Sequence, residues 1–438
     1  MAASTSLPRV SVAGLGAMGI GFARNLLKAG FEVYGYDIVP ALVDRFVQSG
    51  GKATATSSPK EAAEKSDILV IMVINTTQVN AVLFAENTGA IHGLAKNAAV
   101  IISSTIPGAF AREVRSRLNT EFQRPDIRLL DCPVSGGAAG AANGTLTVFA
   151  CGSDDDIKFA TPVLEAIGAH IYRIKNKAGG PGETGSGANG KIVHQVMTQI
   201  AIVLVAEIFA LAVRAGVNTQ ELYDYLQSGL AASWIAENRI PHALEGDEAV
   251  YSAMTNSQKD SSIIVQTAAA LSVPVPLVAQ AEQVYNTTVH IGWAGMEDAL
   301  LWRLFAREYP KDAVFQQTKV PRGTTNPGLS FADIADIMVG VHLAASAEIT
   351  SFTDAVGLHA EQVHSFVCSA AGWNVQFEKL APKMKNGPWY LRDIEEAKEI
   401  GIKLGKALRK ANALGATLPI ASTALQVFQL QVGPLTID

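Results

Sequence analysis

Cysteine is scarce in this chain: only three occur among 438 residues, far apart at Cys132, Cys151 and Cys368. No CxxC pair is present, so the sequence predicts neither a disulfide framework nor a metal site and favours a reducing compartment. A strong charge of one sign is also lacking, because the formal net charge is −5 and lysine and arginine form no cluster. We therefore expect no binding to nucleic acid or to acidic membrane surfaces.

Targeting and membrane segments are not indicated either. The first ten residues, MAASTSLPRV, contain no apolar signal core and lead directly into a strand pattern, so we expect a cytoplasmic protein. The most apolar stretch, 185–217, carries Glu207 near its middle, its uninterrupted apolar run is under ~18 residues, and no second span accompanies it. With 48% hydrophobic residues and 438 positions, the chain is expected to fold into two or three globular domains.

The apolar stretch 185–217 itself predicts one long helix that joins two domains. Its glycines are confined to the start and to Gly216, and its central part is apolar on nearly every face. Lys191, His194 and Gln195 stand three or four residues apart and therefore lie on one side of the first turns.

A dinucleotide-binding pattern occupies the beginning of the chain. A short strand at 9–13 runs into GLGAMG, and a helical segment follows at 20–29. This strand, turn and helix context is the one in which backbone N–H groups approach a pyrophosphate. The expected cofactor-binding residues are Gly14, Gly16, Ala17, Met18 and Gly19.

An acidic residue follows the second predicted strand, 31–36. Asp37 is placed to accept hydrogen bonds from an adenosine ribose and to repel a 2′-phosphate, which favours NAD over NADP. The alternative is a tight turn with an unrelated surface aspartate.

Further strands are predicted at 67–74, 98–102, 127–131 and 145–151, so that the first part reads as an α/β fold with a mostly parallel, doubly wound sheet. Asn75 and the run 103–105 stand at the carboxyl ends of two of these strands, where open α/β sheets bind ligands.

A glycine-rich loop follows the strand at 127–131. Ser135, Gly136 and Gly137 offer backbone N–H groups that could bind a carboxylate, although a plain glycine-rich turn explains the same residues.

Taken in order, GLGAMG, the strand-end acid, DCPVSGGAAGAANGTLTVFACG, GSGANGK and the later pair Lys259 and Asp260 resemble the β-hydroxyacid dehydrogenase family. This family includes 3-hydroxyisobutyrate dehydrogenase and is 6-phosphogluconate dehydrogenase-like. The resemblance covers roughly residues 8 to 305. The segments IMVINTTQVNAVLF, KIVHQ and SWIAENRIPHALEGD are most similar to the L-threonate dehydrogenase branch.

The resemblance implies roles for individual residues. Ser135, Gly136 and Gly137 would bind the substrate carboxylate, Lys191 would be the acid/base, and Gln195 would help to position the substrate. Thr105 and Lys259 match cofactor-contacting positions, and Asn75 at its strand end is expected to contact the cofactor as well.

Two departures from the family pattern concern the substrate pocket. His194 and Gln195 stand where most members have Asn-Asn, although the threonate branch shares His-Gln. The residues AMTNSQ before Lys259 are more polar than usual. His194 is either a substrate contact or a packed helix histidine, and the second is slightly favoured.

The chemistry requires a base within hydrogen-bond reach of the alcohol and a partner that accepts two electrons. A lysine serves as this base only when its amine is partly neutral, which burial and a neighbouring cationic nicotinamide favour. We therefore expect NAD-dependent oxidation of a small hydroxy acid, such as the four-carbon threonate, to its 2-oxo acid. The alternatives are an imine reductase, a 3-hydroxyisobutyrate-type dehydrogenase and a non-catalytic NAD-binding sensor.

The last part of the chain repeats the helical part that precedes it. The segment 206–208 (AEI) recurs at 347–349, and the pairs Gly216/Gly357, Ser228/Ser369, Glu237/Glu378 and Pro241/Pro382 are displaced by the same 141 positions. Pro276, Ala281, Gln283 and Val284 recur 143 positions later at Pro419, Ala424, Gln426 and Val427.

This copy has lost the chemical residues, because Lys191 corresponds to Ala332 and the pair Lys259 and Asp260 to Ile402 and Lys403. The expected domains are 1–183 for the NAD-binding Rossmann domain, 184–308 for a helical substrate and assembly domain, 309–330 for a linker, and 331–438 for a degenerate helical repeat. We expect this repeat to pack on the first helical domain as an intramolecular pseudo-dimer, with further homo-oligomerisation possible.

Overall fold

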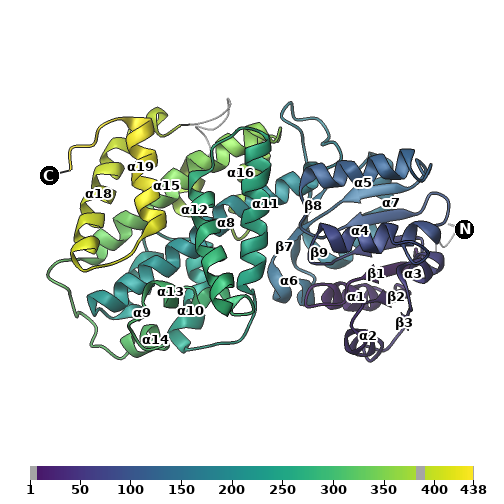
Figure 1. Cartoon of the computed structure of the whole chain (residues 1–438), viewed down its shortest axis with the longest axis horizontal. Helices are drawn as coiled ribbons and strands as arrows, with labels where there is room; N and C mark the ends of the chain where they lie inside the picture. The colour runs from purple at the N-terminus through teal and green to yellow at the C-terminus, as the bar shows by residue number, and fades with distance from the viewer. Residues whose placement is uncertain (1–6, 381–389, 438) are drawn as a thin grey trace, which may run out of the picture. The chain divides into compact units, whose positions relative to one another are not determined.

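The computed structural model describes residues 7–380 and 390–437 of the chain. They form two compact units, Met1–Lys191 and Ile192–Asp438. Strands and helices alternate in the first unit, whereas the second is helical (Figure 1). The predicted class, a Rossmann-type α/β domain followed by an all-α part, is confirmed. The boundary between the units falls inside the long helix, later than the predicted boundary at 183.

The main sheet of the first unit has six parallel strands in the order β3-β2-β1-β4-β5-β6. Because the chain moves outward from β1 first on one side and then on the other, the sheet is doubly wound, and the reversal lies between β1 and β4. The strands are β1 (Val10–Ala13), β2 (Val33–Tyr36), β3 (Ala53–Ala55), β4 (Ile68–Ile71), β5 (Ala99–Ile102) and β6 (Arg128–Asp131).

A second, three-stranded sheet and the helices complete this unit. The small sheet has the order β7-β8-β9, with β7 (Val134–Ser135) antiparallel to β8 (Leu146–Ala150) and β8 parallel to β9 (Gly168–Arg173). The helices are α1 (Gly19–Lys28), α2 (Pro40–Val47), α3 (Pro59–Lys65), α4 (Thr76–Phe84), η1 (Ala90–His92), α5 (Gly108–Thr120), α6 (Gly137–Asn143) and α7 (Asp154–Ile167).

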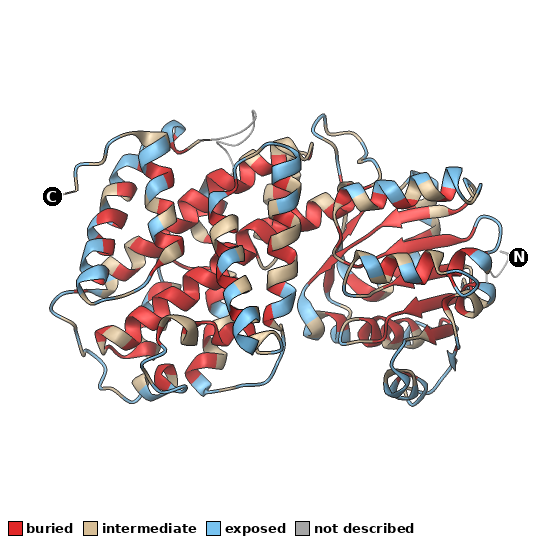
Figure 2. Cartoon of the chain, viewed as in Figure 1, coloured by how far each residue is buried: buried red, intermediate tan, exposed pale blue. Residues whose placement is uncertain are grey.

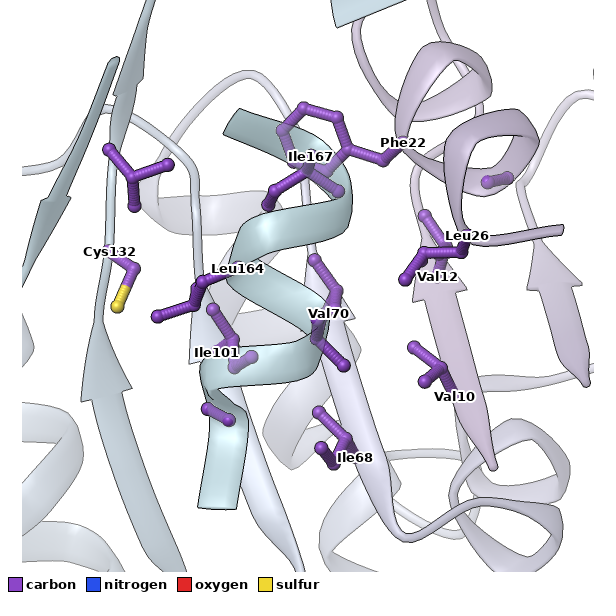
Figure 3. Close-up of a cluster of buried hydrophobic side chains, with 14 of the residues drawn as sticks. Val10, Val12, Phe22, Leu26, Ile68, Val70, Ile101, Cys132, Leu164 and Ile167 are labelled. Carbon is purple, nitrogen blue, oxygen red and sulfur yellow. The ribbon is translucent and has the colours of Figure 1, made fainter. Parts of the chain in front are cut away.

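The strands are apolar on both sides because helices cover both faces of the sheet. Ile68 and Val70 of β4 belong to one buried cluster, with Phe22 of α1 and Leu164 of α7 (Figure 3). The alternate residues of β4 and the inward side chains of α4 and α5 form a second cluster. This two-sided burial explains the continuous apolar runs of β1, β4 and β5, in which every residue is buried (Figure 2).

Some predicted boundaries differ from those in the structure. The strand predicted at 67–74 ends at Ile71. Met72 N still donates to the carbonyl of Ala13 at 2.9 Å, but the next two N–H groups bond to side chains: Val73 N donates to Ser104 Oγ at 2.9 Å and Ile74 N to Gln78 Oε1 at 2.8 Å. The short strands β3 and β9 were not predicted, since neither has the apolar pattern of a central strand.

The second unit consists of helices joined by short connections, and the long helix α8 (Ser186–Ala215) leads into it. The helices that follow are α9 (Thr219–Gln227), α10 (Trp234–Glu245), α11 (Met254–Ala270), α12 (Pro276–Thr288), η2 (Val289–Trp293), η3 (Asp298–Leu300), α13 (Trp302–Phe305), α14 (Ala313–Gln317), α15 (Phe331–Ala355), α16 (Ala360–Cys368), α17 (Val375–Leu380), η5 (Leu391–Asp393), α18 (Ala397–Ala413) and α19 (Pro419–Val432).

Two helices of the described chain, α8 and α15, are long and apolar enough to cross a membrane by length and composition. Their most apolar 18-residue windows are 100% and 83% buried in the structure, which is how the core helices of a globular unit behave. Helix α15 is a second long apolar helix that the sequence did not single out, and the mean hydropathy of its most apolar window is 1.2, against 2.3 for α8.

Helix bounds recur along the second unit with the two displacements seen in the sequence. Helix α16 begins and ends 141 positions after α9, and helix α18 begins and ends 143 positions after α11. Helix α17 begins 141 positions after α10, and helix α19 begins 143 positions after α12. The predicted match of Pro241 with Pro382 lies outside the described residues, since 382 is not among them.

The segment predicted as a linker, 309–330, carries the short helix α14. Val314 of this helix is buried, and its carbonyl accepts a hydrogen bond from Thr219 Oγ1 at 2.7 Å. Asn218 Nδ2 also donates to the carbonyl of Thr318, at 3.0 Å. The segment is therefore packed on the start of α9, which its polar and proline-bearing composition did not indicate.

Two equivalent loops of the second unit pair with each other. Ser233 and Asn374, which are related by the shorter displacement, form an antiparallel bridge. Each residue also caps the following helix, Ser233 by accepting from Ala236 N and Asn374 by accepting from Phe377 N. The flanking hydrogen bonds join Trp234 N to Trp373 O at 3.0 Å and Val375 N to Ala232 O at 3.1 Å.

A buried carboxylate of α8 binds the start of α19. Glu207 has no exposed surface, and its two oxygens accept hydrogen bonds from the N–H groups of Ile420, at 2.6 Å, and Ala421, at 3.2 Å. The first N–H groups of a helix have no partner within that helix and carry its positive dipole end, so they suit an anion.

Glu348 of α15, which follows Glu207 by the shorter displacement, makes the equivalent contact in the opposite direction. Its oxygens accept from the N–H groups of Leu277, at 2.8 Å, and Val278, at 2.9 Å, at the start of α12. The carboxyl group of Glu207 therefore accepts hydrogen bonds from the start of α19, and that of Glu348 from the start of α12.

Burial raises the pKa of Glu207 to about 8 and that of Glu348 to about 7, although the backbone N–H groups favour the anions and oppose this rise. Both carboxyl groups bind a proton more tightly in the folded state than in the unfolded state. Their contribution to stability is therefore complete below about pH 4.5 and is lost as the pH rises through about 7 to 8.

We predict that Glu348→Gln makes the free energy of unfolding less dependent on pH between 5 and 8. A raised pKa costs about 1.4 kcal/mol per unit, so wild type should lose on the order of 3 kcal/mol through this residue, and the amide cannot ionise. Denaturant unfolding at both pH values measures the difference. Glu399→Gln is the control, because the ion pair of Glu399 with Lys403 lowers the pKa of this exposed carboxylate. Equal pH dependence in Glu348→Gln and wild type would contradict the prediction.

Candidate active site

The glycine-rich turn after β1 has the geometry of a phosphate cradle. Gly14 has φ +95°, and a Cβ there would lie 2.2 Å from the carbonyl oxygen of Met72. A Cβ on Gly19 would lie 1.8 Å from Gly14 O, whereas nothing lies within 4 Å of the corresponding position on Gly16. Two glycines are thus required by packing, and the third leaves the outer side of the turn open for a ligand. Of the other predicted contacts in this turn, Ala17 is exposed and Met18 half-buried.

Asp37 lies directly after β2 and is tied to this turn. Its Oδ2 accepts from Leu15 N at 2.7 Å and its Oδ1 from Val39 N at 2.9 Å. The carboxylate is half-buried, so it remains accessible beside the glycine-rich turn. The structure therefore brings together the two predicted parts of the cofactor site.

Asn75 and Thr105 follow β4 and β5, at the carboxyl edge of the sheet. The side chain of Asn75 accepts from Gln78 N at 2.9 Å and caps α4. Thr105 is half-buried just beyond β5. The bond from Val73 N to Ser104 Oγ joins these two strand ends, a role that the sequence did not reveal.

The loop Ser135, Gly136 and Gly137 connects β7 to α6. Ser135 is buried, whereas both glycines are exposed with φ of +131° and +65°. No heavy atom lies within 4 Å of a Cβ built on Gly137. Consecutive N–H groups in this conformation can converge on an anion, and the open side of the loop leaves space for one.

Asp131 at the end of β6 holds the start of α8. Its carboxylate is buried and its Oδ2 accepts from Ala188 N at 2.9 Å. Burial raises the pKa of Asp131 to about 6, while the N–H groups at the start of the helix oppose the rise. The close approach is possible because Gly187 has no side chain, since a Cβ there would lie 2.2 Å from Asp131 O. The sequence analysis did not predict this role. The available signals were an acid at the end of a strand and, much later in the chain, the GSG at 185–187.

Lys191 lies on α8 one turn after Ala188 and is only 6% exposed. A lysine is rarely buried to this extent unless its amine has a function or a partner. Gln195 follows four residues later on the same helix.

A polar cluster in the second unit surrounds Gln195. Gln195 Nε2 donates to Asp260 Oδ2 at 2.6 Å, and Asp260 Oδ1 pairs with the amine of Lys259 at 2.7 Å. His194 is fully buried, and its Nδ1 lies 3.1 Å from Gln195 Oε1. The favoured interpretation of His194 as a packed helix residue agrees with this burial. Asp260 was not among the predicted site residues, although it stands next to Lys259 in the sequence.

Comparison with known proteins covers these same parts of the chain. Residues 9–175 match the family described as the NAD binding domain of 6-phosphogluconate dehydrogenase, and residues 185–304 match the NAD-binding family of NADP-dependent 3-hydroxyisobutyrate dehydrogenase. L-threonate dehydrogenase from Cupriavidus necator is 36% identical over 296 residues, which are 68% of this chain and 95% of that protein.

Solved structures agree with the fold. A structure described as 3-hydroxyisobutyrate dehydrogenase from Salmonella typhimurium is 36% identical, has a TM-score of 0.60, and covers 68% of this chain and 99% of its own. The 6-phosphogluconate dehydrogenase of Plasmodium falciparum is 15% identical with a TM-score of 0.66, and its fold covers 96% of this chain and 92% of its own.

The family matches and the 36% identity therefore decide both family and reaction class. The chain belongs to the 3-hydroxyisobutyrate dehydrogenase-like family of β-hydroxyacid dehydrogenases, on its L-threonate dehydrogenase branch, and is an NAD-dependent hydroxyacid dehydrogenase.

Proposed function

We propose that the chain oxidises a four-carbon sugar acid, threonate or a close analogue, beside its carboxylate to give the 2-oxo acid. The observation that carries this proposal is the 36% identity to L-threonate dehydrogenases across the whole dehydrogenase part. The His194 and Gln195 pair, which departs from the more common Asn-Asn, supports the same substrate class.

Each step has a residue suited to it. The N–H groups of the loop Ser135 to Gly137 bind the substrate carboxylate, and Gln195 positions the hydroxyl-bearing carbon. Lys191 accepts the hydroxyl proton while the hydrogen on carbon leaves with its electron pair, so that the C–O bond becomes a carbonyl. The burial of Lys191 supports this role, since burial favours a neutral amine able to take up the proton.

The residues present fit a dinucleotide. The turn Gly14 to Gly19 leaves its outer side open at Gly16, and Asp37 is anchored beside it. When bound, NAD supplies the two-electron acceptor for the reaction. In this proposal Asn75, Thr105 and Lys259 contact the cofactor, and Asp37 accepts hydrogen bonds from its adenosine ribose.

A second substrate class has its own support. The Salmonella structure with 36% identity is described as a 3-hydroxyisobutyrate dehydrogenase. A 3-hydroxy acid that carries the reacting hydroxyl one carbon further from the carboxylate is therefore the competing substrate.

We further propose that residues 331–438 are a degenerate helical repeat that packs on the first helical domain, 184–308, as an intramolecular pseudo-dimer. Three features support this: the recurring helix bounds, the bridge between the equivalent residues Ser233 and Asn374, and the reciprocal contacts of two glutamates. Glu207 binds the start of α19, and Glu348 binds the start of α12. Such reciprocity is the property of a two-fold interface, in which each side makes the same contact to the other.

The cofactor prediction rests on Asp37. A carboxylate next to a 2′-phosphate places two anions together, and like-charge juxtaposition costs several kcal/mol. We expect kcat/KM with NAD to exceed that with NADP by roughly 30-fold or more, equivalent to about 2 kcal/mol. Steady-state assays with both cofactors measure this. Equal kcat/KM values, or a preference for NADP, would contradict the proposed role of Asp37 in selecting NAD.

The substrate prediction concerns a panel of C3 to C6 hydroxy acids scored by NADH absorbance. We expect the highest kcat/KM with threonate. Lys191→Ala, the control for enzyme-dependent signal, should lower kcat by ~10² to 10⁴-fold with nearly unchanged NAD affinity. A clear preference for 3-hydroxyisobutyrate would select the competing substrate. Activity of Lys191→Ala within about threefold of wild type would show that another group is the base.

The pseudo-dimer prediction concerns a chain cut after Gly328. Loss of the repeat removes the N–H partners of Glu207 and uncovers apolar surface, so the shortened chain should dimerise or aggregate, as measured by analytical ultracentrifugation. The intact chain should show full activity per chain at any dilution, because tethering gives an effective concentration that is roughly millimolar. A monomeric, soluble and fully active shortened chain would refute the proposal.

A further inference from the structure

Four polar side chains of the second unit, two of them on α8, form one continuous chain of contacts. It runs from Lys259 through Asp260 and Gln195 to His194, with distances of 2.7, 2.6 and 3.1 Å. Gln195 is 7% exposed, Asp260 is 8% exposed and His194 is fully buried.

The orientation of the Gln195 amide follows from chemistry. A carboxylate only accepts hydrogen bonds, so the atom of Gln195 that lies 2.6 Å from Asp260 Oδ2 must be the amide nitrogen. The amide oxygen then lies at the opposite end and faces His194 Nδ1. Because that oxygen is an acceptor, Nδ1 of His194 must carry a proton and donate it.

We propose that His194 and Asp260 are positioning residues that together fix the orientation of the Gln195 amide towards substrate. The inference rests on the proposed function, in which Gln195 contacts substrate. Asp260 holds the nitrogen end and His194 the oxygen end. Rotating the amide by half a turn would place its oxygen against the Asp260 carboxylate and would require His194 to change its tautomer.

The His-Gln pair has a physical reason in this arrangement. Glutamine has one more rotatable bond than the asparagine usual in the family, so holding its side chain in one orientation costs more conformational entropy. A buried hydrogen bond at each end of the amide offsets this cost. Asp260 also pairs with Lys259, so the same carboxylate connects the proposed cofactor contact to the proposed substrate contact.

The experiment is a double-mutant cycle read by kcat and KM with the preferred hydroxy acid. His194→Phe keeps a planar ring and removes the donor. We expect it to lower kcat/KM about tenfold in the wild-type chain and less than twofold in the Gln195→Ala chain, because the imidazole acts only through Gln195. Asp260→Asn, whose amide can present either end, should lose part of its effect in the Gln195→Ala chain, and the remaining part reflects the lost ion pair with Lys259.

His342→Phe is the matched control. His342 is a fully buried histidine of α15, and neither of its nitrogens has a hydrogen-bond partner among the residues that the structure describes. Burial lowers the pKa of His342 to about 3, so a neutral ring is replaced by a neutral ring. This variant should keep wild-type kcat and KM. Thermal unfolding of every variant separates a loss of positioning from a loss of folding.

The outcomes are distinct. Equal losses from His194→Phe in the presence and absence of the Gln195 side chain would overturn the positioning role, whatever the substrate. Wild-type kcat/KM in Gln195→Ala would instead refute the substrate contact of Gln195, and with it the part of the proposed function on which the inference rests. A tenfold effect that disappears in the Gln195→Ala chain, with unchanged unfolding temperature, would establish it.

Discussion

The exchange of two buried carboxylates is the interaction on which the helical unit depends. Glu207 lies in the segment 184–308 and binds the first N–H groups of α19. Glu348 lies in the segment 331–438 and binds the first N–H groups of α12. Neither carboxyl group could be buried alone, because removing a polar group from water costs free energy unless hydrogen bonds replace the solvent. Each carboxyl group therefore finds its hydrogen-bond donors in the other part of the helical unit, and separating the two parts would expose both the carboxyl groups and the helix starts.

A buried carboxylate also binds the start of the helix that carries the proposed catalytic lysine. Asp131 binds the start of α8 through Ala188 N, as Glu207 binds the start of α19. Because a helix is stiff, anchoring its first turn also fixes the direction of the residues that follow, including Lys191. The orientation of the side chain with the proposed catalytic role thus depends on a buried carboxylate that accepts a backbone N–H at the start of the same helix.

Much of the candidate site could be predicted because its parts are local. The turn Gly14 to Gly19, the acid Asp37 and the loop Ser135 to Gly137 are each determined by a few consecutive residues and a strand pattern. Asp260 could not be assigned in this way, since its contact with Gln195 joins positions 65 residues apart. His194 remained ambiguous for the same reason, because its burial is decided by helices that pack around α8.

The sequence by itself determined the fold class, the family, the place of the long helix and the displacement of the repeat. These follow from periodicity, glycine placement and motif order, which are properties of short segments. Only the tertiary structure decided which groups meet. Glu207 binds the start of α19 and Glu348 the start of α12, residues 309–330 pack on α9, Asp131 bonds the start of α8, and Asp260 bonds Gln195. Such pairings depend on the distance and orientation of segments far apart along the chain, and a buried charge becomes interpretable only when its hydrogen-bond partners are known.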